Sequence, residues 1–258
     1  MNVSAMNRAV LLSVGLAALV CVAPALSHAA EADAPVFRGG AATSNITPPL
    51  GCDIVGNWGT LQATYIHDEL HARSLVLDDG ARRLVLVICD NLTIDRPVYD
   101  QAKARLHKKT GIPPEHMLMA AVHTHSGPPA RQGLSLEDYS GLTEYQQFLA
   151  DRIVDCVLCA ITNLEPAQAG WGCGEEPEQV FNRRWHLDDP GMMISPFGDQ
   201  DQVRMNPPRG HDALVKPAGP TDPEIAFLAV RAVDGRPIAL LANYSLHYVG
   251  GVPRGHIS

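Results

Sequence analysis

The chain has 258 residues, of which 46% are hydrophobic and 19% are charged, a composition typical of one globular domain. Its formal net charge is −8, its pI is about 5.7, and no cluster of lysine and arginine stands out along the sequence. Because nucleic-acid binding usually requires a basic surface, nucleic acid is not an expected partner.

The first 29 residues have the pattern of a secretory signal peptide. Arg8 supplies a positive charge, Ala9–Leu26 is almost wholly apolar, and Ser27-His28-Ala29 offers a cleavage site with small residues. We therefore expect a mature chain of residues 30–258 that is secreted or periplasmic, with an uncleaved anchor as the weaker alternative. No other stretch approaches the roughly 20 apolar residues that span a bilayer.

Strands and helices are predicted to alternate irregularly in the first half of the mature chain. The hydrophobic pattern and the turn residues predict four strands and one helix. The strands are Val36–Ile46, His71–Leu77, Arg83–Ile88 and Met117–Val122, and the helix is Pro97–Lys109.

The second half begins with an amphipathic helix, Glu144–Leu164, and a short strand, Ala167–Gly174. No periodicity is visible from Glu175 to Thr221, and an irregular stretch of this length usually indicates function or disorder. A hairpin of Ile225–Val233 and Pro237–His247 follows. The element order predicts an α/β (mixed) class, with α+β as the alternative, in which mixed β-sheets are flanked by helices.

Five cysteines remain after the predicted cleavage. Cys156 and Cys159 have the spacing of a redox pair, but their place in the second helix favours packed thiols. A disulfide that involves Cys52 or Cys173 stays open.

Two histidines, His123 and His125, follow the apolar strand Met117–Val122. Side chains alternate along a strand, so residues i and i+2 point to the same side. We therefore expect both imidazoles to face one space at the carboxyl end of the strand, where sheet proteins often hold their chemistry. The pattern favours a metal or acid–base site, with hydrogen bonding in a polar loop as the alternative.

A second apolar strand, Pro237–His247, also ends in a histidine. Three histidines at two strand ends could supply a divalent metal with imidazole nitrogens, and zinc is the usual metal of an exported hydrolase. Taken alone, His247 is equally compatible with a core histidine.

Three further features are ambiguous. Arg183 is compatible with a solvated surface position or with an arginine that holds a substrate carbonyl or an oxyanion. Asp90 could orient a ligand histidine, and a role at a turn or at the entry of a helix is equally compatible. His67 and His71 are interpreted as structural or loop residues, because the acid between them is misplaced for a zincin motif.

An ordered series of motifs resembles the neutral/alkaline (non-lysosomal) ceramidase family, in its amino-terminal catalytic domain. The resemblance extends from about Gly39 to the last residue. The matching segments are Ala42–Gly51, Ala72–Gly80, His123–Pro128, Asn182-Arg183, Asp222–Glu224, Asn243–His247 and His256–Ser258.

This resemblance implies zinc-dependent hydrolysis of the N-acyl amide of ceramide to a sphingoid base and a fatty acid. It implies that His123 and His247 are Zn²⁺ ligands and that His125 and Arg183 contact the substrate or the transition state. The family's other zinc ligands, a glutamate and a tyrosine, are expected beyond residue 258, which indicates a truncated catalytic domain. The expected partner is a lipid amide, with transient contact to a membrane surface, and the oligomeric state is left open.

Two other His-x-His families fit less well. In the amidohydrolase superfamily the motif lies on the first barrel strand, whereas about three strands precede it here. Metallo-β-lactamase-like enzymes require His-x-His-x-Asp-His, which Ser126-Gly127-Pro128 does not supply. A metal-dependent esterase or amidase with another small substrate, and a non-catalytic lipid- or glycan-binding relative, remain as alternatives.

Overall fold

The computed structural model describes residues 36–56, 59–132, 141–247 and 251–258, which belong to one compact unit. The predicted signal peptide and its boundary at residue 30 lie outside the described residues. None of the described helices is long and apolar enough to cross a membrane.

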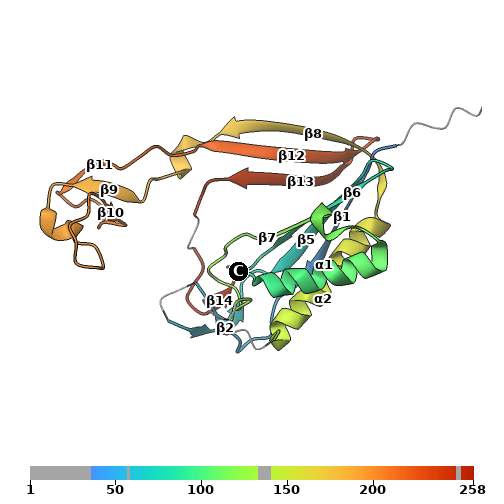
Figure 1. Cartoon of the computed structure of the whole chain (residues 1–258), viewed down its shortest axis with the longest axis horizontal. Coiled ribbons are helices and arrows are strands. Elements are labelled where there is room, and N and C mark those ends of the chain that lie inside the picture. The colour runs from blue at the N-terminus through green and yellow to red at the C-terminus, as the bar shows by residue number, and fades with distance from the viewer. Residues whose placement is uncertain (1–35, 57–58, 133–140, 248–250) are drawn as a thin grey trace, which may run out of the picture. The chain divides into compact units, whose positions relative to one another are not determined.

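A seven-stranded mixed sheet is the largest element of the fold (Figure 1). Its strands are β1 (Arg38–Asn45), β5 (His71–Asp78), β6 (Arg83–Cys89), β7 (Met117–Ala121), β8 (Glu165–Glu175), β12 (Glu224–Ala232) and β13 (Pro237–Tyr244). Their order across the sheet is β13-β12-β8-β1-β5-β6-β7. Neighbours pair antiparallel except β6 and β7, which are parallel. The predicted α/β (mixed) class is confirmed.

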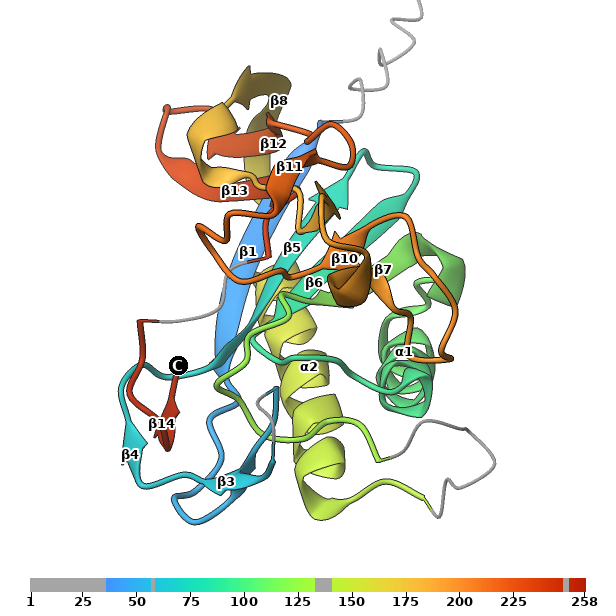
Figure 2. The ribbon, with the colours of Figure 1, turned by 90° about the vertical axis from the view of Figure 1, so that its left-hand side faces the viewer.

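Two α-helices, α1 (Arg96–Thr110) and α2 (Glu144–Thr162), form the helical layer (Figures 1 and 2). Helix α2 packs against β1 and β5, and α1 packs against α2. The core between these elements includes Val85 and Val87 of β6 and Leu149 and Ile153 of α2, which are each exposed by 1% or less. The apolar faces that the sequence predicted for these elements therefore meet in one core.

The ends of both helices follow from their sequences. Helix α1 ends at Gly111, whose φ of 74° lies in the left-handed region that glycine adopts at little cost. Helix α2 begins with a capping box between Thr143 and Gln146. The Thr143 hydroxyl accepts a hydrogen bond from Gln146 N at 3.2 Å, and Gln146 Oε1 accepts one from Thr143 N at 2.9 Å.

The cysteines of the described residues are free thiols. Cys156 is buried, and its Sγ lies 3.2 Å from both Ala72 O and Ser74 Oγ, whereas Cys159 is exposed. Cys52 and Cys173 are also free. Both residues lie in α2, as expected, but the interpretation as packed thiols is confirmed for Cys156 and is wrong for Cys159.

The segment from Glu175 to Thr221 contains a second sheet that the sequence did not predict. This sheet has the order β10-β9-β11 and consists of β9 (Arg184–Leu187), β10 (Arg204–Met205) and β11 (Leu214–Pro217). Each strand has four residues or fewer, which is too short for alternation to be recognised. The expectation of an irregular stretch is wrong here.

The remaining elements are short. Two-stranded pairs are formed by β2 (Asp53–Ile54) with β3 (Leu61–Gln62), and by β4 (Tyr65–Ile66) with β14 (His256–Ile257). The 3-10 helices are η1 (Pro114–His116), η3 (Pro177–Gln179) and η4 (Pro190–Met193).

The contact between β1 and the end of α2 requires a glycine at position 40. A Cβ there would overlap the Ala160 carbonyl oxygen and would lie 2.9 Å from Leu164 N and 3.0 Å from Asn163 C. We predict that Gly40→Ala lowers the free energy of unfolding by at least about 2 kcal/mol, because these atoms belong to the backbone and cannot turn away.

Urea denaturation measures this free energy, and Gly170→Ala in β8 is the matched control. A Cβ at Gly170 meets no heavy atom within 4 Å, so the control should stay within about 0.5 kcal/mol of the wild type. Equal stability of the two variants would contradict the proposed contact.

Candidate metal centre

His123 and His125 lie beyond the end of β7, not within it. The strand ends at Ala121, and His123 has a φ of 69°, which is uncommon for a residue other than glycine. The argument from strand alternation therefore does not apply, because the backbone turns at His123. The two imidazoles are nevertheless neighbours, with ring centroids 4.9 Å apart.

His247 brings a third imidazole to the same place. Its ring centroid lies 5.3 Å from that of His123 and 5.0 Å from that of His125. One ligand atom from each of the three residues lies within 4.8 Å of the others, and no other group of three metal-binding side chains this close occurs in the described part of the chain. Strand β13 ends at Tyr244, so His247 lies beyond the strand and not within it.

Backbone carbonyls orient two of the three rings. His123 Nδ1 lies 2.9 Å from Leu92 O, and His125 Nδ1 lies 2.5 Å from Gly56 O. A carbonyl oxygen can only accept a hydrogen bond, so Nδ1 carries the proton in both rings and Nε2 carries the lone pair. This is the arrangement found at metal-binding histidines, in which the second nitrogen donates to a carbonyl or a carboxylate. The donor set therefore fits a divalent metal.

The charge distribution favours a neutral His247. Loss of solvent lowers the pKa of its imidazole, and the positive charge of Arg183 lowers this pKa further, as does any charge that His125 or His123 carries when protonated. A metal binds the neutral imidazole, so a lowered pKa extends the pH range in which His247 can be a ligand.

The positive charge of Arg183 acts on His247. Its side chain is exposed, and its carbonyl accepts a hydrogen bond from Asn206 N at 2.8 Å. The structure therefore brings together His123, His125 and His247, and it places the charge of Arg183 where it acts on the last of them.

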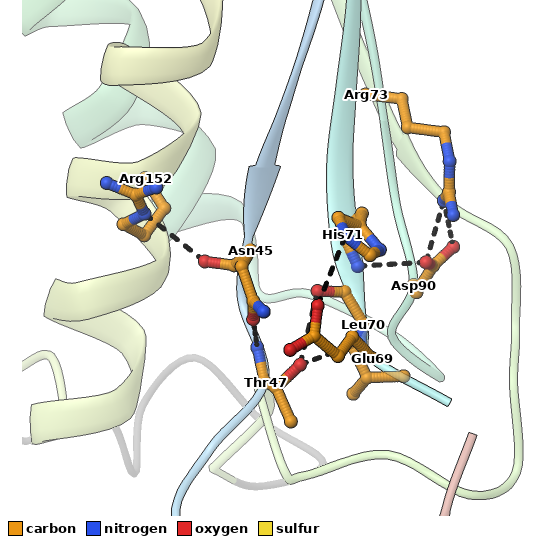
Figure 3. A network of polar contacts seen from close by, with 8 residues as sticks. All are labelled: Asn45, Thr47, Glu69, Leu70, His71, Arg73, Asp90 and Arg152. Carbon is orange, nitrogen blue, oxygen red and sulfur yellow. Dashed lines mark hydrogen bonds and ion pairs between the residues drawn. The ribbon is translucent and has the colours of Figure 1, made fainter. Parts of the chain in front are cut away.

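Asp90 has a structural role at this end of the sheet (Figure 3). Its carboxylate accepts hydrogen bonds from Arg73 Nη1, at 2.6 and 2.7 Å, and from His71 N at 2.9 Å. These contacts give Asp90 a role that the sequence did not predict, because they join the loop after β6 to β5.

Backbone groups that follow Asp90 contact the cluster instead. Asn91 O accepts a hydrogen bond from His123 N at 3.0 Å, and Leu92 O lies next to His123 Nδ1. Sequence reasoning missed these groups, because a backbone carbonyl leaves no signature in the sequence.

The fold and the cluster define an α/β protein with a candidate centre of three imidazoles between strand ends. No protein-family model matches the chain. Neutral ceramidase of Pseudomonas aeruginosa is 33% identical to it over 187 residues, which are 68% of this chain and 28% of that protein.

The solved structures agree in fold. The crystal structure of neutral ceramidase from Pseudomonas aeruginosa matches with a TM-score of 0.57 and 24% identity, over 81% of this chain and 32% of that one. A ceramidase complexed with C2 matches with a TM-score of 0.54 and 24% identity, over 80% of this chain and 30% of that one. The chain thus spans less than a third of the length of these relatives. The resemblance to the neutral ceramidase family that its motifs predicted is confirmed.

We predict that His123→Ala and His247→Ala each weaken zinc binding by the full-length protein at least about 10-fold, because each removes a ligand from the cluster. Elemental analysis of protein dialysed against limiting zinc measures the loss. His116→Ala, a histidine of η1 outside the cluster, is the control and should retain the wild-type zinc content. An unchanged zinc content in both variants would refute the assignment of His123 and His247 as metal ligands.

Proposed function

We propose that this chain carries part of the active site of a zinc-dependent amidase that hydrolyses the N-acyl amide of a ceramide-like lipid. The observation that carries the proposal is the cluster of His123, His125 and His247, with two of its rings oriented by backbone carbonyls. The similarity to neutral ceramidase supports amide hydrolysis as the reaction class. In this proposal His123 and His247 hold the zinc, while His125 and Arg183 contact the substrate.

A zinc ion held by imidazoles supplies Lewis acidity and lowers the pKa of water to near neutrality. In the hydrolysis, the oxygen of water bonds to the acyl carbon, the amide C–N bond breaks, and the departing nitrogen takes up a proton. The products are a fatty acid and a sphingoid base.

The protein side chains have separate roles in this scheme. Negative charge develops on the amide oxygen, and in this scheme Arg183, whose positive charge acts on His247, stabilises it. The hydrogen bond from Nδ1 to Gly56 O directs Nε2 of His125 away from that carbonyl, so that this nitrogen can accept a hydrogen bond from the water or from a substrate hydroxyl.

We predict that the full-length protein cleaves a fluorescent ceramide and that Arg183→Ala lowers kcat/KM about 100-fold or more while the zinc content is unchanged. The control is Arg184→Ala, the next residue in the chain, whose side chain is also exposed. Cleavage of a water-soluble ester, but not of the ceramide, would leave a metal hydrolase with a different substrate. No cleavage of either substrate by the zinc-loaded protein would refute the proposed activity.

We further propose that the protein is exported, which places it where extracellular or membrane lipid is accessible. Arg8, the apolar segment Ala9–Leu26 and the small residues before Glu31 support this proposal. We predict cleavage near Ala29 or Ala30, and amino-terminal sequencing of the exported protein measures it. A mature protein that still begins at Met1 would contradict this prediction.

A further inference from the structure

Gly56 lies in close contact with His125. A Cβ built on Gly56 would lie 2.8 Å from both Cα and Cγ of His125 and 2.9 Å from its Cβ. Real Cβ atoms do not approach other heavy atoms so closely, and the atoms concerned are the backbone and the rigid base of the imidazole. A side chain at position 56 therefore requires His125 or the loop to move.

The backbone conformation of Gly56 leads to the same requirement. Its φ of 104° lies in a region that residues with a Cβ rarely adopt. In this conformation the Gly56 carbonyl reaches His125 Nδ1 at 2.5 Å. The missing side chain and the left-handed backbone together produce the hydrogen bond that orients the ring.

The loop is also fixed to the segment that follows His125. Val55 N donates to Gly127 O at 3.0 Å, and the two residues form an antiparallel bridge. Gly127 is itself buried, and a Cβ there would lie 3.4 Å from Thr124 Cγ2 and 3.5 Å from Asp90 O. Because Val55 is held in this way, the loop cannot withdraw from His125 without breaking the bridge.

We propose that Gly56 is a positioning residue of the site. It holds His125 in the tautomer with the proton on Nδ1, so that Nε2 faces His123 and His247. The functional consequence rests on the proposed role of His125 at the zinc site, whereas the tautomer is a property of the metal-free protein and is tested separately.

The experiment compares Gly56→Ala with Gly51→Ala in the full-length protein. Gly51 is a matched control, because its φ of 88° gives a similar backbone strain while a Cβ there meets no heavy atom within 4 Å. Long-range ¹H–¹⁵N NMR of ¹⁵N-histidine-labelled, metal-free protein reads the tautomer of each ring. Titration with zinc gives the affinity of the same samples.

We expect His125 of the wild type and of Gly51→Ala to carry its proton on Nδ1. In Gly56→Ala this signal should be lost or mixed with the Nε2–H form, while zinc binding should be retained, because His123 and His247 hold the zinc in the proposed function and His125 contacts the substrate. An unchanged His125 tautomer in Gly56→Ala, or an equal change in Gly51→Ala, would overturn the proposal.

Two further results keep the test decisive. If Gly56→Ala does not fold, the wild type alone decides, because Nε2–H at His125 of the metal-free wild type would overturn the proposal. If the wild type binds no zinc and cleaves no amide, the proposed function fails, while the NMR comparison still tests the positioning role of Gly56.

Discussion

Two hydrogen bonds from imidazole to backbone, His123 Nδ1 to Leu92 O and His125 Nδ1 to Gly56 O, determine what the histidine cluster can do. An imidazole without such a bond can exchange its proton between both nitrogens and rotate about its side-chain torsions. With Nδ1 held by a carbonyl, the lone pair of Nε2 has one direction, and two such rings can point toward a common centre. His247, whose pKa is lowered by loss of solvent and by the positive charge of Arg183, adds a third imidazole to the cluster.

The fold explains why these carbonyls are in place. Strands β6 and β7 are parallel, so their carboxyl ends lie at the same edge of the sheet, and the loop after β6 runs beside the turn after β7. The ion pair of Asp90 with Arg73 and its hydrogen bond with His71 N attach the beginning of that loop to β5 (Figure 3). The second carbonyl comes from the loop that Val55 fixes to Gly127. The site is therefore built mainly by backbone contacts between loops at strand ends, a common basis for functional sites on a rigid sheet.

Much of this arrangement could be predicted from the sequence, because it depends on side-chain patterns. The main elements were predicted from the apolar run before His123, the hairpin that ends at His247, the helix signals around Pro97 and the helical spacing of Glu144–Leu164. These predictions brought both histidine segments to strand ends. The left-handed backbone of His123 and the carbonyls of Leu92 and Gly56 could not be predicted, because every residue has the same backbone groups. The sheet of β9, β10 and β11 was missed since its strands are too short to show a period.

The central claim of this account is that the three imidazoles form one site in which at least two of them, His123 and His247, hold a metal. X-ray absorption at the zinc edge of the zinc-loaded, full-length protein tests it most directly, because imidazole rings scatter with a characteristic pattern beyond the first shell. The account predicts nitrogen and oxygen ligands at about 2.0–2.1 Å with at least two imidazoles and no sulfur. A sulfur shell at about 2.3 Å, which would assign the metal to cysteine, or a spectrum without imidazole scattering would contradict it.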